Sequence, residues 1–411
     1  MNLPSAICQL PAAPRILIRG TNWLGDAVMT TTPLLRLREK FPDAHITLLC
    51  PEKLRELWLH HPAVNATISF APGESVFSVG RKLHRWGERP REPDFANQCA
   101  VATAREDARP TTFDLALVLP NSPRAAIETW LAGIPRRIGL ARPWRNFFLT
   151  QAVAPRTDAV KMRKRSVGEI KELAAATNQS RTGVSPVRAG GTPALLSSAH
   201  QLHEYLHLAA ALGANPEPVP PQLTVLPEEI AAAKKKFGLA EITQPIFGLN
   251  PGAEYGPAKR WPVERFIAAA KEIQQRTNCT WLLLGGKSDI TLTGQIAAAI
   301  HDSRFTIHDL CGRTSLRELM SLLKMCRVLL TNDTGPMHVA AALGTPVVVP
   351  FGSTSPELTG PGLPGDARNR LLKSDAPCSP CFLRECPIDF RCMNGISVER
   401  VVEAVVESFN R

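Results

Sequence analysis

Short apolar runs that end in glycine or polar residues recur along the chain, and they predict buried β-strands. Residues 15–20 (RILIRG) make the first run, and residues 45–50 (HITLLC) make the second. Between them, Asp26 opens a pattern of helical period. The apolar positions on its inner face are Ala27, Leu34, Leu35 and Leu37. A strand, a helix and a strand in this order form a βαβ unit, which indicates a parallel sheet.

The same alternation continues to the C-terminus. Further strands are expected at residues 113–119, 245–250, 279–285, 327–331 and 346–350. Helices are expected at residues 263–277, 316–324, 338–343 and 398–409. Each half of the protein therefore has the pattern of an α/β domain.

A proline-rich segment marks the boundary between these halves. Residues 215–221 (NPEPVPP) are stiff and cannot pair into a central strand, so we place an inter-domain linker at residues 215–243. The linker separates an N-terminal domain at 15–214 from a C-terminal domain at 244–411. A short N-terminal tail, residues 1–14, precedes both domains.

Two segments of the N-terminal domain look inserted. Residues 85–112 are rich in Arg, Glu, Pro and Ala, and residues 178–198 are small, polar and rich in Gly and Pro. Neither segment has an apolar period, so both are interpreted as surface loops without a chemical role.

Composition narrows the class of protein. The chain has 411 residues, of which 44% are apolar and 21% charged, and these values exclude wholesale disorder. At roughly 100–200 residues per domain, two or three domains are expected. No stretch reaches the roughly 18 apolar residues that span a bilayer. The tail lacks the basic and apolar regions of a secretory signal, so we expect a cytosolic protein.

The net charge of +11 favours an anionic partner. Three basic stretches fall before the linker, at residues 81–91, 136–145 and 163–165. They fit an N-terminal domain that meets anionic lipid heads or phosphates, and they equally fit an ordinary solvated face. Charge alone does not choose between a sugar nucleotide, an acidic membrane surface and nucleic acid.

The first candidate site is the turn from Thr21 to Asp26 (TNWLGD), which joins a strand to a helix N-terminus. Its backbone N–H groups face whatever binds above the sheet, and Gly25 lets a ligand or a neighbouring backbone approach closely. The dinucleotide fingerprint GxGxxG is absent. Asp26 is interpreted either as the helix N-cap, which aspartate favours, or as a general base at the carboxyl edge of a strand.

The second candidate site is residues 250–262 (NPGAEYGPAKRWP), which follow a strand and precede a helix. Gly252 and Gly256 loosen the loop, while Lys259 and Arg260 place positive charge beside the helix start. This combination suits a pyrophosphate, although the spacing is not that of a Walker A loop. A basic surface loop without a ligand would have the same composition.

The third candidate site is residues 331–338 (TNDTGPMH), between an apolar strand and a helix of small residues. Asp333, Thr334 and the Gly335 amide can cap that helix, and they can also bind a phosphate or a ribose. His338 falls in the first turn, where the helix dipole disfavours imidazolium, so a neutral ring is expected. The alternative is a well-capped helix with a buried histidine.

Four of the ten cysteines gather within 15 residues near the C-terminus. They are Cys378, Cys381, Cys386 and Cys392. A structural zinc held by four thiolates is one interpretation, although the spacing is not the usual pair of CxxC knuckles. Reversible disulfides are another, and a catalytic role is disfavoured.

Four motifs together resemble the ADP-heptose:lipopolysaccharide heptosyltransferases, which form family 9 of the glycosyltransferases. The motifs are RILIRGTNWLGDAVM from Arg15, LVLPNS from Leu117, NPGAEYGPAKRWP from Asn250 and TNDTGPMHVAAALGTPVV from Thr331. The resemblance covers nearly the whole chain outside the two insertions. It implies an α/β protein of the GT-B fold, in which two Rossmann-like domains face each other across a cleft.

The resemblance also implies an activity: inverting transfer of L-glycero-D-manno-heptose from ADP-heptose to a lipopolysaccharide inner core that already bears one heptose. The C-terminal domain would hold the donor and the N-terminal domain the acceptor, at the inner face of the inner membrane. No cofactor is required, because basic residues and helix N-termini take the pyrophosphate charge.

Three alternatives stay open. One is a family-9 transferase with a different acceptor or heptose position, and another is a nucleotide-sugar epimerase on the same fold. The third is a metal-binding module that engages nucleic acid through the cysteines. Those cysteines lie outside any basic stretch, so no nucleic-acid partner is expected.

Site residues follow from the resemblance. Asp26 matches the catalytic aspartate that deprotonates the acceptor hydroxyl, and Lys259 matches the lysine that stabilises the leaving diphosphate. The loop around Asp26 would be shaped by Thr21, Asn22 and Gly25. The donor-binding residues would be Gly252, Ala253, Arg260, Asp289, Asp333, Thr334, Gly335 and His338. Within that set, the amides of Gly252 and Ala253 would bind phosphates, and Asp289 would contact the ribose.

Overall fold

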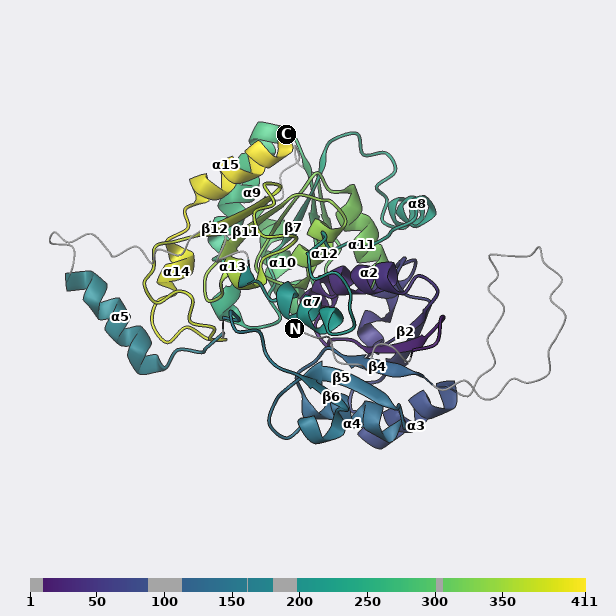
Figure 1. The fold of residues 1–411 in the computed structure, drawn as a ribbon. Coiled ribbons are helices and arrows are strands. Elements are labelled where there is room, and N and C mark those ends of the chain that lie inside the picture. The colour runs from purple at the N-terminus through teal and green to yellow at the C-terminus, as the bar shows by residue number, and fades with distance from the viewer. Residues whose placement is uncertain (1–9, 88–112, 161, 180–197, 301–305) are drawn as a thin grey trace. The chain divides into compact units, whose positions relative to one another are not determined.

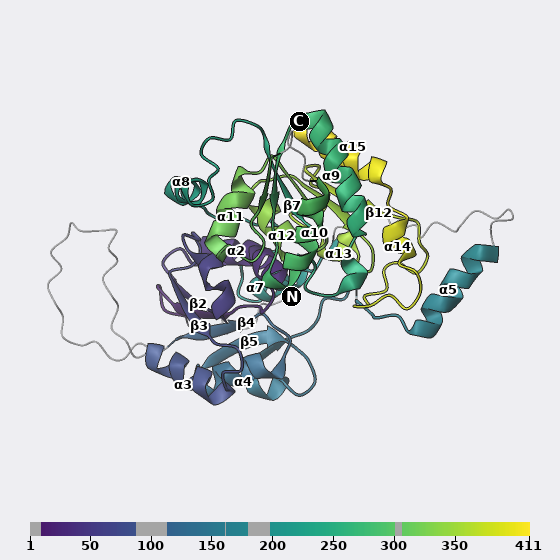
Figure 2. The same cartoon turned by 180° about the vertical axis from the view of Figure 1, so that it is seen from behind.

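The structure, a computed structural model, describes residues 10–87, 113–160, 162–179, 198–300 and 306–411. The chain divides into two compact units, each built on a six-stranded sheet (Figures 1 and 2). Unit 1 comprises Met1–Asn22, Pro33–Arg156 and Glu204–Glu217. Unit 2 comprises Trp23–Thr32, Thr157–His203 and Pro218–Arg411.

Unit 1 has a wholly parallel sheet of order β3-β2-β1-β4-β5-β6. Its strands are β1 (Arg15–Arg19), β2 (His45–Pro51), β3 (Ala66–Phe70), β4 (Leu115–Val118), β5 (Arg136–Leu140) and β6 (Gln151–Val153). Its helices are α2 (Thr31–Lys40), α3 (Val76–Gly87), α4 (Pro123–Leu131) and α7 (Leu202–Ala210), with the short 3-10 segments η2 (Glu52–Trp58) and η3 (Asn146–Phe148). The order is that of a Rossmann sheet.

The core of unit 1 forms because β1 has an apolar centre, Ile16 to Ile18, and is buried along its whole length. Leu17 of β1 packs in one cluster with Leu49 of β2 and with Val79 and Leu83 of α3. The one charged residue at the end of the strand, Arg19, is paired with buried Glu128 at 2.8 Å, which satisfies both charges.

Unit 2 repeats the same order in its own sheet, β12-β11-β10-β7-β8-β9, again wholly parallel. Its strands are β7 (Ile246–Asn250), β8 (Thr280–Leu283), β9 (Ile307–Asp309), β10 (Val328–Thr331), β11 (Val347–Phe351) and β12 (Asn369–Lys373). Its longer helices are α5 (Val167–Gln179), α8 (Pro227–Lys236), α9 (Val263–Thr277), α10 (Ile290–Ile300), α11 (Leu316–Met325), α12 (Gly335–Ala342) and α15 (Val398–Phe409). The shorter ones are α1 (Leu24–Met29), α13 (Pro356–Thr359), α14 (Arg391–Asn394), η4 (Pro257–Lys259) and η5 (Lys287–Asp289).

The largest core of unit 2 lies between its sheet and helices α9, α10 and α15. Phe266 and Ile273 of α9 pack there against Trp281 of β8 and Val401 of α15. Figures 1 and 2 show α9 and α15 side by side, as their contacts require. The C-terminal helix is therefore part of the second unit's core.

Most of the predicted elements are confirmed. The helices expected at 263–277 and 398–409 have those bounds, and each predicted strand is present to within about two residues. One prediction was wrong: the helix that was expected to open at Asp26 begins at Leu24 and breaks at Thr30, so α1 and α2 are separate.

The unit boundaries differ from the predicted domains of 15–214 and 244–411. Trp23–Thr32 and Thr157–His203 group with unit 2, and the predicted linker contains α8. Residues 85–87 belong to α3, and 178–179 belong to α5. The remainder of the two predicted insertions lies outside the described residues, apart from Ser198.

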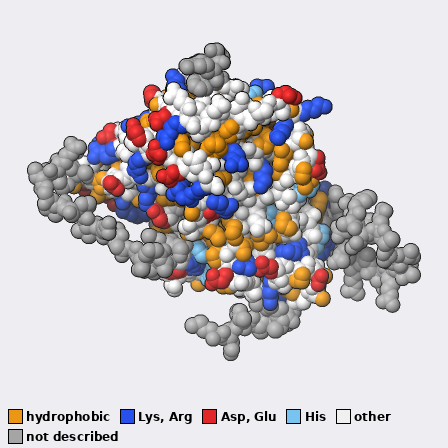
Figure 3. Space-filling model, turned by 90° about the horizontal axis from the view of Figure 1, so that it is seen from above, with side chains coloured by type: hydrophobic (Ala, Val, Ile, Leu, Met, Phe, Trp, Pro, Cys, Tyr) orange, Lys and Arg blue, Asp and Glu red, His pale blue; other side chains and the backbone are white. Residues whose placement is uncertain are grey.

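Among the described residues, no helix combines the length and the apolar character needed to cross a lipid bilayer. Lys and Arg side chains are interspersed with hydrophobic and acidic ones on the face seen in Figure 3.

Candidate active site

The second and third candidate loops meet because their strands are neighbours. β7 and β10 pair in parallel, with Asn250 opposite Thr331, so both loops leave the same carboxyl edge. The chain order reverses between these two strands, which makes this edge the switch point where open α/β sheets bind ligands.

A buried amide network fixes the two loops to each other. Asn250 donates to the Thr331 hydroxyl at 3.1 Å, and Asn332 donates to the Pro251 carbonyl at 2.7 Å. The Asn332 side-chain oxygen accepts the Trp261 amide at 2.9 Å. Because every partner is buried, these bonds hold the loops in one arrangement.

Lys259 and Asp333 form an ion pair across this edge. The Lys259 ammonium lies 2.6 Å from the Asp333 carboxylate, and both side chains are largely buried. The Thr354 hydroxyl donates to the same carboxylate at 2.5 Å. The prediction that Asp333 caps α12 was therefore wrong: Thr334 is the N-cap, without a side-chain bond, and Asp333 points to Lys259 and Thr354.

Asp26 lies on α1, which packs on α12. The interpretation of Asp26 as an N-cap was wrong, because Trp23 is the N-cap and Asp26 falls in the first turn. Its Oδ1 accepts a hydrogen bond of 3.0 Å from the Gln201 side chain. The α1–α12 contact requires glycine at position 25, where a Cβ atom would lie 2.7 Å from His338 Cδ2.

His338 is buried, and its burial favours the neutral ring that was expected. Desolvation lowers the pKa of His338 to about 4, against a smaller opposite effect of Asp333. A neutral imidazole offers one donor and one acceptor.

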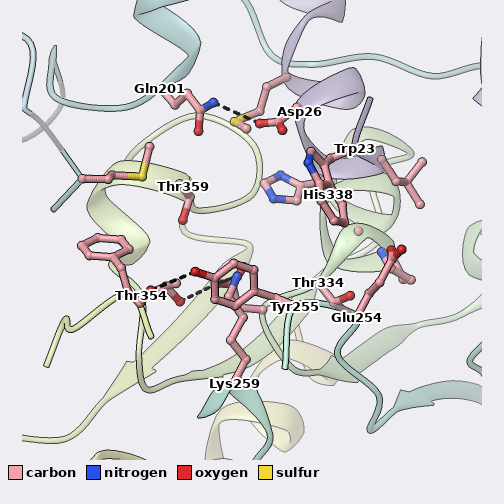
Figure 4. A pocket seen from close by; sticks show the side chains of 18 of the residues that line it. Trp23, Asp26, Gln201, Glu254, Tyr255, Lys259, Thr334, His338, Thr354 and Thr359 are labelled. Carbon is pink, nitrogen blue, oxygen red and sulfur yellow. Dashed lines mark hydrogen bonds and ion pairs between the residues drawn. The ribbon is translucent and has the colours of Figure 1, made fainter. Parts of the chain in front are cut away.

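These groups line one pocket of about 550 Å³ within unit 2, called the main pocket below. Figure 4 shows Asp26 and Gln201 toward one end of it, Lys259 toward the other and His338 between them. Of the predicted residues, it brings together Gly25, Asp26, Lys259, Asp333, Thr334, Gly335 and His338. A cavity of this size fits a small organic ligand.

Several lining residues were missed by the sequence analysis. They include Gln201, Glu254, Tyr255, Thr354, Phe382 and Arg384. Tyr255 carries two cations on its ring: Lys259 Nζ lies 5.0 Å and Arg384 Cζ 5.2 Å from the ring centroid. Tyr255 lies in the basic loop at residues 250–262, so the sequence could have indicated it as a site residue. Nothing in the sequence indicates that Arg384 lies near Lys259.

The remaining predicted donor residues form a second group outside the lining of the main pocket. Asp289 packs so closely on Gly252 that a Cβ there would lie 2.3 Å from its carboxylate. Arg260 lies 3.6 Å from Asp289 and donates weakly to the Ala253 carbonyl at 3.5 Å. The structure thus brings these four residues together, with Asp289 turned toward Arg260 and Gly252.

Thr21 and Asn22 belong to unit 1, although they precede α1 directly in sequence. Thr21 is buried, and Asn22 accepts a bond of 3.1 Å from Arg19. Asn22 therefore belongs to the Arg19 network of unit 1, whereas the buried Thr21 hydroxyl makes no hydrogen bond with any described residue.

The four clustered cysteines are free thiols: Cys378, Cys381 and Cys386 lie in an irregular loop between β12 and α14, and Cys392 lies in α14. Burial, with smaller contributions from the Cys378, Cys386 and Cys381 thiols, raises the pKa of Cys392 to about 12, and Cys378 and Cys381 pack in one buried cluster. Within the described part of the chain, no three His, Cys, Asp or Glu side chains are arranged to hold a metal. Structural zinc stays a prediction from the spacing, which metal analysis of the purified protein tests.

Solved structures with the same fold define the class. The ADP-heptose lipopolysaccharide heptosyltransferase II of Escherichia coli superposes with a TM-score of 0.68 at 25% identity, covering 96% of this chain and 98% of that chain. A family 9 glycosyltransferase from Veillonella parvula gives a TM-score of 0.70 at 20% identity, covering 97% of both chains. The prediction of a GT-B α/β fold with two Rossmann-like units is confirmed.

Sequence comparison gives the family. Residues 191–390 match the model of glycosyltransferase family 9 (heptosyltransferase). The lipooligosaccharide heptosyltransferase 2 of Haemophilus ducreyi is 30% identical over 354 residues, which is 84% of this chain and 86% of the relative. The lipopolysaccharide heptosyltransferase 2 of Escherichia coli is 29% identical over 355 residues, which is 84% and 85%. The chain belongs to glycosyltransferase family 9, and it is an enzyme.

Proposed function

We propose that this enzyme is an inverting heptosyltransferase of the second type. It would move L-glycero-D-manno-heptose from ADP-heptose to the heptose of the lipopolysaccharide inner core. The observation that carries the proposal is the main pocket, which holds a carboxylate, Asp26, and a largely buried cation, Lys259, in one cavity. The relatives at about 30% identity bear the names of heptosyltransferases 2.

Asp26 is the general base of the proposed reaction. Its carboxylate takes the proton of the acceptor hydroxyl while that oxygen bonds to the anomeric carbon of the heptose. On the opposite face of the same carbon, the bond to the diphosphate oxygen breaks, so the configuration inverts. Gln201 donates to one oxygen of Asp26 and thereby orients the carboxylate.

Lys259 stabilises the leaving ADP. Negative charge builds on the diphosphate as the bond between the heptose and the diphosphate breaks. A fixed, largely buried ammonium stabilises that charge more than water does. Arg384 lines the same pocket beside Tyr255 and supplies a second cation. At the N-terminus of α12, the backbone amides of Thr334 and Gly335 would donate hydrogen bonds to the diphosphate.

The acceptor and the membrane complete the proposal. An inner-core acceptor is anchored in lipid, so the enzyme would work at the inner face of the inner membrane, in peripheral contact with its anionic surface. The basic stretches of the sequence support such contact in part. Arg163 pairs with Glu169, and Arg165 donates to the Pro377 carbonyl at 2.8 Å, so these two also have structural roles.

The test is ADP release from ADP-heptose, with and without an inner-core acceptor that carries one heptose. The proposal predicts acceptor-dependent release and one added heptose by mass spectrometry. Release with other acceptors only would favour a family-9 transferase of different acceptor or heptose position. Conversion of the donor without an acceptor would favour an epimerase.

A further inference from the structure

The connection between β5 and β6 in unit 1 presents aromatic side chains to solvent. Trp144 is 89% exposed and Phe147 is 84% exposed, the highest values for large apolar side chains among the described residues. We call residues 141–148 (ARPWRNFF) the aromatic loop. The Phe148 ring contacts Phe147 at 5.5 Å and the half-exposed Trp130 of α4 at 5.6 Å, so the apolar surface extends onto the helix. Contiguous exposed apolar surface of this kind marks an interaction site.

The loop is held in shape by its own hydrogen bonds. Arg145 is buried, and its guanidinium donates to the Pro120 carbonyl at 2.5 Å. The Arg142 amide donates to the Asn146 side chain at 2.8 Å, and the Phe148 amide donates to the Arg145 carbonyl at 3.0 Å. Trp144 has a φ of +66°, a left-handed conformation that a bulky residue adopts only where its surroundings impose it. The fold therefore directs Trp144 outward.

The stretch of sequence around the loop carries only positive charge. Residues 129–157 contain five arginines and no aspartate or glutamate. Arg145 and Arg137 donate to backbone carbonyls at short distance, whereas half-buried Arg142 reaches, among the described residues, only the Ala141 carbonyl, at 3.5 Å. Aromatic side chains with arginines around them match the headgroup level of an anionic bilayer, where rings insert and guanidinium groups meet lipid phosphates.

The position of the loop in the sheet suits a lipid-anchored acceptor. β1, β4 and β5 are parallel, so the aromatic loop leaves the same carboxyl edge as the turn after β1 that leads to Asp26. Any acceptor that reaches that edge while its lipid stays in the bilayer brings the bilayer to the same side of unit 1.

We propose that the aromatic loop docks unit 1 on an anionic bilayer, with Trp144 and Phe147 inserted at the headgroup level and Arg142 on lipid phosphates. The proposal rests on the membrane association proposed above and names the segment that makes it. The test uses neither donor nor lipopolysaccharide. A negative result would therefore contradict membrane docking by the aromatic loop without contradicting the proposed transferase activity.

The experiment is co-sedimentation of the full chain with vesicles of phosphatidylcholine, with and without phosphatidylglycerol. We expect binding to the anionic vesicles and a decrease of at least about tenfold in Trp144→Ser/Phe147→Ser. Arg142→Gln should weaken binding and reduce its salt dependence. Leu59→Ser and Arg55→Gln are the controls, because both residues are exposed in the β2–β3 connection, at the opposite end of the strand order from β5 and β6. Circular dichroism and melting temperature check that each variant folds.

Three results would overturn the proposal. The first is no binding of the wild type to anionic vesicles at low salt. The second is binding only after lipopolysaccharide is added to the vesicles, which would show that the loop binds the acceptor and not the bilayer. The third is loss of a dimer in the aromatic variant by analytical ultracentrifugation, which would assign the loop to a second copy of the chain.

Discussion

The Lys259 ammonium lies 2.6 Å from the Asp333 carboxylate. The Thr354 hydroxyl donates a hydrogen bond to the Asp333 carboxylate and so holds it in place. A diphosphate that enters the main pocket therefore meets a lysine already fixed in place, and little reorganisation is needed when charge develops on the leaving group. Asp333 positions the cation, which explains why a carboxylate lies in a site for an anion.

Replacing Lys259 by alanine should reduce both donor affinity and turnover, with kcat/KM lower by about 100-fold or more. The change also leaves the buried Asp333 without its cation, so the melting temperature should fall. The double variant Lys259→Ala/Asp333→Asn should recover stability without activity. Lys271→Ala, at an exposed position of α9, is the control. Unchanged donor affinity and turnover in Lys259→Ala would refute the phosphate role.

Arg384 should bind the donor from the cysteine-rich loop. Because its guanidinium lies over Tyr255 beside Lys259, Arg384→Ala should raise the KM for the donor about tenfold, and Arg384→Lys should restore part of the loss. Steady-state kinetics at varied donor concentration measure both effects. Arg368→Ala, exposed and outside the main pocket, should behave as wild type. An unaltered KM in Arg384→Ala would remove this residue from the site.

Gly25 should tolerate no side chain. An added Cβ would lie 2.7 Å from His338 Cδ2, so Gly25→Ala should cost about 1–3 kcal/mol in the free energy of unfolding and displace Asp26. Gly294→Ala is the matched control: no atom lies within 4 Å of its Cβ, and alanine in the interior of α10 should stabilise by up to about 1 kcal/mol. Urea denaturation measures both, and equal stability of Gly25→Ala and wild type would contradict the packing.

Stability should fall on acidification between pH 6.5 and 4. The pKa of His338 is about 4 in the folded protein, below its ordinary value of 6.5. In that window the unfolded chain binds a proton at this imidazole and the folded chain does not, so unfolding is favoured as the pH drops, by up to about 3 kcal/mol. The loss levels off below pH 4, where both states are protonated.

The check is urea denaturation of His338→Gln across this pH range. Its free energy of unfolding should vary less with pH than that of the wild type. His84→Gln removes an exposed imidazole of unit 1 and should keep the wild-type slope. Identical slopes for wild type and His338→Gln would show that His338 is not the group responsible.

The fold was predictable wherever the apolar positions followed a single helical or strand period. The apolar run of β1 and the stripe of α9 gave their bounds directly. Short edge strands such as β6 and β9 were missed, because three residues carry no readable period. The break between α1 and α2 was missed because Thr30 and Thr31 do not interrupt the apolar pattern; their hydroxyls bond back to the backbone.

The site was predictable where its residues share one motif. Asp333 and His338 were recognised from a single loop, and β-strand adjacency then joined that loop to Lys259. Gln201 lies 175 residues from its partner Asp26, and Arg384 lies 129 residues from Tyr255, a separation that only tertiary packing closes. The direction of Asp333 was also unpredictable, because a capping carboxylate and an ion-paired one look alike in sequence.

In the proposed reaction, Asp26 is the base for acceptor-dependent heptosyl transfer. The most direct test is single-turnover ADP release from ADP-heptose and the one-heptose inner-core acceptor, by wild type and by Asp26→Asn, which retains an oxygen that can accept the Gln201 bond. We expect a rate about 100- to 10,000-fold lower in the variant, with donor affinity unchanged. Wild-type rates in Asp26→Asn would contradict this role.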